Sequence, residues 1–177
     1  MRRGLKGLIG FLSIVFVGGV GFYACNDANC PENVEAPLRI AIANSRTKSQ
    51  STFENLEIYH KGKRDTILSI SLWGIGEKKD SAIYTNKTGI NRLDVTLHVE
   101  KEISKYRLSY ALKSKDTIAD TFTIYHRNYP YYLSDKCPCL MYYHLDSVLH
   151  SKHLIHDYSF INQNVTNEKE LHVKISY

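Results

Sequence analysis

Apolar residues alternate with polar residues along most of the chain after residue 35. The pattern is clearest over 93–99, where every second residue is leucine or valine and the residues between them are polar. It recurs in six further segments: 38–43, 56–70, 106–112, 122–126, 158–161 and 171–175. A period of two gives a β-strand one apolar face to bury. The pattern predicts an all-β chain with a single antiparallel β-sandwich, immunoglobulin-like in general architecture, over residues 36–177.

The same alternation predicts the core, because burial of one face fixes which side chains point inward. The turn 60–63 contains a glycine between two alternating segments and predicts a β-hairpin. A short helical turn is expected only over 146–156. The residues predicted to face inward are Leu93, Val95, Leu97, Val99, Leu108, Phe122, Ile124, Val173 and Ile175.

Residues 1–25 have the composition of an export signal. Three basic residues precede an uncharged, mostly apolar run that ends at Ala24, and Cys25 follows. A basic start and an apolar run that ends in a small residue are typical of a secretory signal. A cysteine directly after the small residue indicates a lipoprotein, in which that cysteine carries the lipid. We therefore expect a signal peptide over 1–24, lipidated Cys25 as the first mature residue, and a tether over 25–35.

An uncleaved transmembrane anchor and an ordinary cleaved signal are the alternatives to this interpretation. The run over 7–24 would span roughly 27 Å as a helix, slightly less than a hydrocarbon core of about 30 Å. In the lipoprotein and anchor interpretations, the folded part lies outside the cytoplasm and is tethered to a membrane. We expect it in the cell envelope, on the periplasmic side of the outer membrane or at the cell surface.

The charge balance excludes one class of partner. The whole chain has a net charge of +5, but the leader contributes three cations and no acid, so the remainder has +2. Basic residues otherwise occur in short runs such as 61–64. Nucleic-acid binding requires a concentrated basic face, so no nucleic-acid partner is expected.

Three cysteines remain after Cys25, and an oxidising compartment permits a disulfide between two of them. We expect Cys30 to pair with Cys137, closing a loop of about 100 residues that contributes about 4.7 kcal/mol in the chain-entropy model. Pairing of Cys30 with Cys139 is the alternative. A Cys137–Cys139 bridge would be strained across one residue, and that spacing is also too short for a structural zinc site.

Four sequence features occur together along the chain. They are a second cysteine soon after Cys25 (Cys30-Pro31), an Asp-Thr-hydrophobic-Tyr strand (120–125), a tyrosine-rich segment that runs into a serine and a cysteine (131–137), and an asparagine–valine turn before a final strand (164–166 and 171–177). In these features the chain resembles a family of short Bacteroidetes lipoproteins known only as domain of unknown function 6452. The resemblance implies an exported, β-rich lipoprotein and no particular activity.

The chain departs from the pattern of that family at one place. The family tends to have glycine after the late cysteine, whereas this chain has Pro138 followed by Cys139. The departure leaves the partner of Cys30 open between Cys137 and Cys139.

His150, His153 and His156 form a weak candidate metal site. On a helix, a spacing of three residues places side chains near one face, and imidazole is a ligand for zinc and copper. A polar loop with unrelated histidines has the same pattern, and no His-Glu-x-x-His motif accompanies it. No cofactor is therefore expected.

Two further patterns have a functional and a structural interpretation. Tyr129 to Tyr132 and Tyr142-Tyr143 would form an aromatic platform for a sugar or peptide, although aromatic residues on strands usually pack in the core or in cross-strand pairs. Five aspartates precede Ser or Thr, either as a short O-glycosylation signal of exported Bacteroidetes proteins or as residues that open turns. The weak candidate acceptors are Thr66, Ser81, Thr117 and Ser147.

The sequence contains no nucleophile elbow, phosphate-binding loop or carboxylate pair with supporting context. We therefore expect no enzymatic activity. The expected function is that of a non-catalytic structural or envelope-assembly protein, held to the membrane by its N-terminal lipid and bound to an envelope protein. The alternative is a ligand-binding lipoprotein for a glycan, a peptide or a metal.

Overall fold

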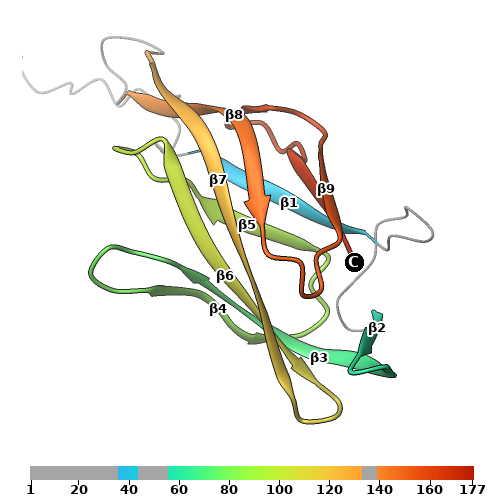
Figure 1. Ribbon diagram of the computed structural model, residues 1–177. Coiled ribbons are helices and arrows are strands. Elements are labelled where there is room, and N and C mark those ends of the chain that lie inside the picture. The colour runs from blue at the N-terminus through green and yellow to red at the C-terminus, as the bar shows by residue number, and fades with distance from the viewer. Residues whose placement is uncertain (1–35, 44–55, 133–138) are drawn as a thin grey trace, which may run out of the picture. The chain divides into compact units, whose positions relative to one another are not determined.

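The computed structural model describes residues 36–43, 56–132 and 139–177 (Figure 1). All of them belong to one compact unit, Pro31–Tyr177. They form β-strands joined by turns and loops, so the predicted all-β class is confirmed. In this part of the chain there is no helix long and apolar enough to cross a membrane. The predicted leader and tether, with Cys25, Cys30 and Cys137, lie outside the described residues.

The strands form two sheets. One has four strands in the order β5-β1-β11-β9, and the other has seven, with the order β10-β8-β7-β6-β3-β2 and β4 paired to β3. The strands are β1 (Pro37–Ala43), β2 (Glu57–His60), β3 (Lys63–Gly74), β4 (Ser81–Lys87), β5 (Arg92–Thr96), β6 (Ile103–Leu112), β7 (Thr117–Tyr131), β8 (Leu140–His150), β9 (Asp157–Phe160), β10 (Asn164–Val165) and β11 (Val173–Ser176).

One strand pair departs from the predicted antiparallel arrangement. β1 and β11 are parallel, with Ile40 opposite Val173 and Ile42 opposite Ile175. The other described pairs are antiparallel. The four-stranded sheet therefore differs from the wholly antiparallel sheets of an immunoglobulin domain.

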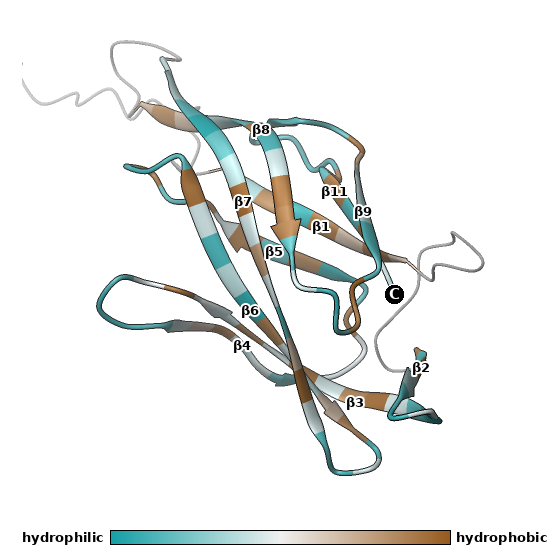
Figure 2. Ribbon diagram, in the orientation of Figure 1, coloured by the Kyte–Doolittle hydropathy of each residue, from teal (hydrophilic) through white to brown (hydrophobic). Residues whose placement is uncertain are grey.

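The core lies between the two sheets and contains residues from both. Leu38 and Leu93 from the smaller sheet and Leu108 and Ile124 from the larger one are fully buried. Figure 2 shows the corresponding alternation of apolar and polar bands along β6 and β7. Eight of the nine residues predicted to face inward are buried. The exception is Val99, which is half-buried because β5 ends at Thr96 and the chain bends before β6.

The predicted hairpin is formed by β2 and β3. Lys61 (φ 50°) and Gly62 (φ 74°) connect the paired residues His60 and Lys63. Both connecting residues lie in the left-handed region, which is the geometry of a type I′ turn and matches the twist of the strands. Glycine tolerates this conformation without a steric penalty.

The predicted helical turn over 146–156 is wrong. β8 continues to His150, and residues 151–156 form a loop. Opposite this part of β8, the register of β7 shifts between Tyr125 and His126, so that β8 contains one extra residue. This β-bulge places the buried Leu145 and Val148 three positions apart. A bulged strand therefore has a local apolar spacing like that of a helix.

A buried carboxylate holds the loop 151–156. Asp120 is fully buried on β7, and its Oδ1 accepts hydrogen bonds from Ser151 Oγ (2.6 Å) and the backbone N–H of His153 (2.9 Å). Its Oδ2 accepts hydrogen bonds from the backbone N–H groups of Leu154 (2.8 Å) and Ile155 (3.1 Å). The loop joins β8 of the larger sheet to β9 of the smaller sheet, so Asp120 fixes a connection between the sheets.

A buried histidine fastens β1 to the residues before β11. The backbone N–H of Arg39 donates to Nδ1 of His172 (3.0 Å), and the N–H of His172 donates to the carbonyl of Arg39 (2.9 Å). Because Nδ1 accepts a hydrogen bond, the ring is neutral with its proton on Nε2. Burial and the nearby Arg39 guanidinium lower the pKa of His172 to about 4.

We predict that Asp120→Ala lowers the free energy of unfolding by about 3 kcal/mol or more, because several buried donors lose their acceptor. Urea denaturation of the purified protein measures this difference. Asp146→Ala is the matched control, since Asp146 pairs with Arg127 at the surface; it should cost less than about 1 kcal/mol. Equal losses from the two substitutions would show that Asp120 has no special role.

We also predict that the protein loses about 2 kcal/mol of stability between pH 7 and pH 5 through His172. Its pKa is lowered in the folded state, so below about pH 6.5 the unfolded chain binds a proton that the native ring does not. The stability is present above that pH and is lost as the pH falls toward 4. Urea denaturation should show a flatter pH profile for His172→Gln than for the exposed control His156→Gln. Identical profiles for these two variants would contradict the assignment.

Candidate functional site

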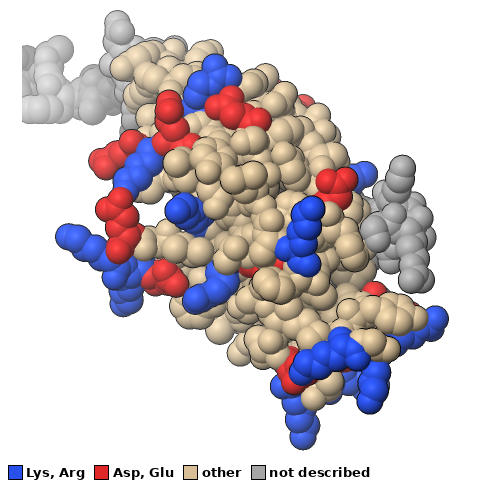
Figure 3. Space-filling view, in the orientation of Figure 1, with Lys and Arg blue, Asp and Glu red and all other residues tan. Residues whose placement is uncertain are grey.

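A cleft of about 490 Å³ lies between the turn 75–80, which joins β3 to β4, and the loop 97–102, which joins β5 to β6. Its lining comes from both sheets. In Figure 3 this region is seen as a hollow at the left, surrounded by acidic and basic side chains. The lining residues are Gly74, Ile75, Gly76, Glu77, Ser81, Thr96, His98, Lys101, Ile103, Ser104, Lys105 and Tyr106.

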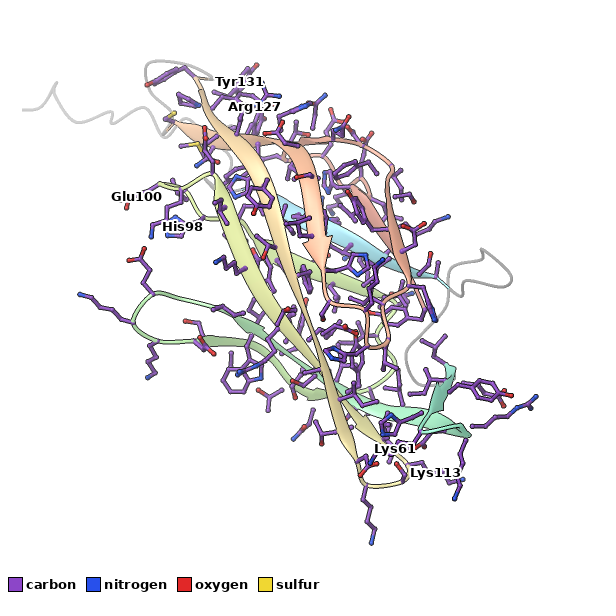
Figure 4. The ribbon with its side chains drawn as sticks, in the orientation of Figure 1. Lys61, His98, Glu100, Lys113, Arg127 and Tyr131 are labelled. Atoms are coloured by element: carbon purple, nitrogen blue, oxygen red, sulfur yellow. The ribbon has the colours of Figure 1, made fainter. Side chains whose placement is uncertain are left out.

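Charged side chains surround the mouth of the cleft. Glu77 and Lys101 form an ion pair that connects the turn to the loop, and the Lys101 ammonium lowers the pKa of Glu77. Lys105 is exposed and makes no ion pair with any described acidic residue. His98 lies on the same side of the domain as Glu100 (Figure 4), and its Nδ1 accepts the backbone N–H of Glu100 (3.2 Å). The mouth therefore offers both signs of charge, with one ammonium group uncompensated.

The inner wall of the cleft is aromatic. Tyr106 is buried, its hydroxyl donates to the carbonyl of Thr96 (2.6 Å), and its ring stacks on Phe122 at 5.1 Å. Burial raises the pKa of Tyr106 well above its ordinary value, so the phenol stays protonated. The hydrogen bond joins β6 of the larger sheet to β5 of the smaller sheet and fixes this end of the cleft.

A row of polar side chains, of which Ser104 and His126 are buried and Asn128 is half-buried, fixes the loop 97–102. Ser104 Oγ accepts the backbone N–H of His98 (2.8 Å) and lies 2.9 Å from His126 Nε2. His126 Nδ1 lies 2.7 Å from Asn128 Oδ1. Because that amide oxygen can only accept, His126 has its proton on Nδ1 and Ser104 donates to Nε2. Burial lowers the pKa of His126, which favours this neutral ring.

The amide group of Asn128 completes this row. Its Nδ2 donates toward three carbonyls of the loop, those of His98 (3.1 Å), Val99 (2.6 Å) and Lys101 (3.1 Å). A serine, a histidine and an orienting third group also occur in nucleophilic sites. Here Ser104 is only 5% exposed, and its hydroxyl already accepts a backbone hydrogen bond. The geometry therefore favours a structural role, in which the row holds one wall of the cleft in place.

The structure does not bring the three candidate metal-binding histidines together. His150 ends β8, its Nδ1 lies 2.8 Å from the Ser151 carbonyl, and its ring packs against Tyr158. His153 lies beside Asp120 (3.4 Å), and His156 is exposed in the following loop. The three histidines would share one face only on a helix, and this segment is instead the end of β8 followed by a loop. Within the described ranges, no group of three or more His, Cys, Asp or Glu side chains is arranged to hold a metal ion.

Of the three cysteines considered for a disulfide, the structure describes only Cys139. It is a half-buried free thiol, and its Sγ lies 3.5 Å from the Leu140 carbonyl. Cys30 lies outside the described residues, so its alternative pairing with Cys139 stays a prediction. The pairing of Cys30 with Cys137 stays a prediction, because both residues lie outside the described residues.

The aspartates that precede Ser or Thr all have structural partners. Asp65 lies on β3 and accepts the backbone N–H of Thr66 (2.7 Å), a local bond from side chain to backbone. Ser81 and Thr117 are exposed, whereas Thr66 and Ser147 are half-buried, and glycosylation at these four positions stays a prediction. The other partners are Arg107 for Asp80, Lys61 and His60 for Asp116, the loop 151–155 for Asp120, and Arg127 for Asp146.

The tyrosines form a small cluster near the end of the β7–β8 hairpin. Tyr131 stacks on Tyr142 at 5.0 Å, and Tyr129 meets the edge of Tyr142 at 6.1 Å. Tyr132 is exposed, but Tyr143 is fully buried in the core. The cluster is thus a set of cross-strand pairs with one exposed side, rather than the larger platform that the sequence suggested.

Sequence reasoning did not identify the cleft. The available signal was the interruption of alternation at 75–80 and again at 100–102, two polar segments that are separate in sequence. Their contact depends on the pairing of β3 with β6, where Gly74 lies opposite Tyr106. No local pattern encodes that contact.

Comparison with known proteins identifies the family of the chain. No curated protein and no solved structure matches this chain. The model of a family of unknown function, DUF6452, matches residues 69–177. The matched part includes all the lining residues of the cleft, the Ser104–His126–Asn128 row and Asp120. The predicted resemblance is confirmed, and the chain belongs to the DUF6452 family.

Proposed function

We propose that the chain is an exported, lipid-tethered protein of the cell envelope that binds a segment of a partner protein without catalysis. The tether is inferred from the leader over 1–24 and from Cys25. The binding role is inferred from the cleft, which combines an aromatic inner wall with a few polar groups at its mouth.

The observation that carries this proposal is the way the cleft is held open. Asn128 donates to three carbonyls of the loop 97–102, and the Glu77–Lys101 pair ties that loop to the opposite turn. A wall held by side-chain hydrogen bonds loses little conformational freedom when a ligand binds, and this saving favours recognition. The buried polar side chains beside the cleft, Ser104 and His126, use their hydrogen bonds to hold the loop 97–102 in place.

The chemistry of the cleft suits a short peptide segment of mixed character. Ile75 and Ile103 supply apolar contact, both are partly exposed, and they flank the charged mouth. Lys105 would pair with an acidic side chain of the segment, since it has no acidic partner among the described residues. Binding of a partner segment accords with a structural or assembly role in the envelope.

Glycan binding at the tyrosine cluster is the second candidate. Tyr131 is 45% exposed and Tyr129 is 37% exposed, so ring faces or edges are accessible to a sugar. Arg127 and His144 lie opposite each other on the adjoining positions of β7 and β8 and would supply polar contacts. This candidate uses a different surface, so the two proposals can be separated by substitution.

We predict that Cys25→Ala releases the protein from the membrane or blocks its processing, because the variant has no thiol to carry the lipid. Detergent phase partitioning and intact mass of the protein from envelopes measure the change. Cys139→Ala is the matched control, and it should leave both properties unchanged. Unaltered partitioning and mass in Cys25→Ala would indicate an uncleaved anchor instead.

We predict that a photoreactive p-benzoylphenylalanine in place of Ile103 yields a discrete protein adduct when intact cells are irradiated. The same replacement of Leu149, which is exposed outside the cleft, is the control and should yield none. Mass spectrometry identifies the captured partner. Equal adducts at both positions would contradict binding in the cleft. No adduct at 103, together with saturable glycan binding that Tyr131→Ala abolishes, would favour the second candidate.

A further inference from the structure

Two turns that are distant in sequence meet at one end of the larger sheet. The β2–β3 turn contains Lys61, and the β6–β7 turn spans residues 113–116. The backbone N–H of Lys113 donates to the carbonyl of Thr66 (3.0 Å), and that of Ser114 reaches Asp65 Oδ1 (3.4 Å). We call this end the basic tip and define it by Glu57, Lys61, Lys63, Arg64, Asp65, Lys113, Lys115 and Asp116.

Salt bridges and hydrogen bonds fix the geometry of the basic tip. Lys61 Nζ lies 2.8 Å from Asp116 Oδ2, and His60 Nε2 lies 3.2 Å from the same oxygen. These contacts lower the pKa of Asp116, with the hydrogen bond from Lys61 as the largest cause. Asp116 therefore stays ionised and clamps the two turns together.

The basic tip contains the whole net charge of the predicted mature chain. It has five cations and three acids, a net charge of +2, so the rest of the mature chain has equal numbers of each. Lys63, Lys113 and Lys115 have no acidic partner among the described residues and are exposed. Figure 4 shows Lys61 and Lys113 at the same end of the domain, and Figure 3 shows the concentration of Lys and Arg there.

Two exposed apolar side chains accompany these cations. Tyr59 is 60% exposed, with the Arg64 guanidinium 6.0 Å from its ring centre, and Leu68 is 50% exposed on β3. Cations next to exposed aromatic and aliphatic groups suit an anionic lipid surface, where the apolar groups enter the headgroup region and the ammonium groups meet phosphates. A soluble polyanion would use the cations but would offer no apolar phase to Leu68.

We propose that the basic tip docks on an anionic phospholipid surface. The apolar pair Tyr59 and Leu68 contacts the interface, and Lys63, Lys113 and Lys115 contact lipid phosphates. The interaction is electrostatic in its long-range part, so it weakens as salt screens the charges. This site is separate from the cleft and does not depend on the nature of the ligand bound there.

The position of the basic tip indicates which surface it meets. β7 spans 15 residues, or roughly 45–50 Å at the usual rise per residue. The tip lies just before the first residue of β7. The other end of β7 contains Pro130, which lies opposite Met141 of β8. The backbone N–H of Ala36 donates to the carbonyl of Met141, so Ala36 lies near that other end. The chain thus enters the domain at the end of β7 away from the tip. The tip is therefore remote from the residue at which the chain enters the domain, and we propose that it contacts a surface other than the one that holds the N-terminal segment.

A vesicle-capture experiment tests the proposal with the full chain. The protein is reconstituted by its N-terminal segment, lipidated or not, into neutral phosphatidylcholine vesicles. Capture of a second, fluorescent vesicle population containing phosphatidylglycerol is then measured at low and high salt. We expect capture at low salt and at least a tenfold loss with the double substitution Lys63→Glu and Lys113→Glu.

The control is the double substitution Lys152→Glu and Lys169→Glu, which makes the same change in net charge at exposed positions outside the tip. It should retain most of the capture, and the melting temperatures of both variants should match that of the parent protein. Absence of capture by the parent protein, or equal losses in the two variants, would overturn the proposal. Binding to an immobilised anionic polysaccharide without vesicle capture would also overturn it and would identify a polymer instead. Retention of the protein in the phosphatidylcholine vesicles is verified before capture is measured, so failure of the lipid tether is distinguished from failure of the tip, and Cys25→Ala tests the tether separately.

Discussion

The fully buried carboxylate of Asp120 is the interaction on which the two-sheet arrangement most depends. An ionised group in an apolar interior is costly unless donors surround it, and here one hydroxyl and three backbone N–H groups of the loop 151–155 do so. That loop is the connection from β8 in one sheet to β9 in the other, and it also buries Leu154 and Ile155. The carboxylate therefore replaces the hydrogen bonds that a regular strand would supply. With these hydrogen bonds the chain passes from β8 of the larger sheet to β9 of the smaller sheet, and the backbone N–H groups of the loop between them keep an acceptor.

The same principle shapes the cleft, with neutral groups instead of a charge. Asn128 and Ser104 satisfy the backbone of the loop 97–102, and His126 lies between them and fixes the orientation of both. In both places a long loop is specified by a side chain buried beneath it. The difference matters for function. Asp120 on β7 supports a loop that covers the core, whereas Asn128 supports a loop whose other side borders a cleft with an uncompensated Lys105. In the proposed function, the second of these two loops forms a wall of the binding cleft, whereas the first has a structural role.

Local chemistry explains which features the sequence could predict. Alternation identifies Leu93, Leu108 and Ile124 as core residues, because the period of two within one strand is enough to tell its buried face from its exposed face. The pair Lys61-Gly62 predicts a turn, because a tight hairpin turn requires the left-handed backbone conformation that glycine adopts easily. The bulge in β8 opposite Tyr125 explains why a helical turn was wrongly predicted there, since one extra residue changes the apolar spacing of the strand. The parallel β1–β11 pair, the cleft and the basic tip could not be predicted, because each depends on contacts between distant segments. The run 61–64 looks isolated in the sequence and becomes part of a patch only when 113–116 packs beside it.

The arrangement of charge follows from the way a β-sandwich divides its residues. Strand interiors alternate and leave half of their side chains for the core, so charges without a partner collect at turns and on the exposed strand residues beside them, such as Lys63 and Lys105. In this domain the long β6–β7 hairpin separates two such regions. The cleft lies beside the first residues of β6, and the basic tip lies at the turn after its last residue. The pairing of β6 with both β3 and β7 holds the spacing between them rigid. The two proposed contacts, a partner segment at the cleft and an anionic surface at the tip, are therefore compatible with each other, because neither requires the strands between them to move.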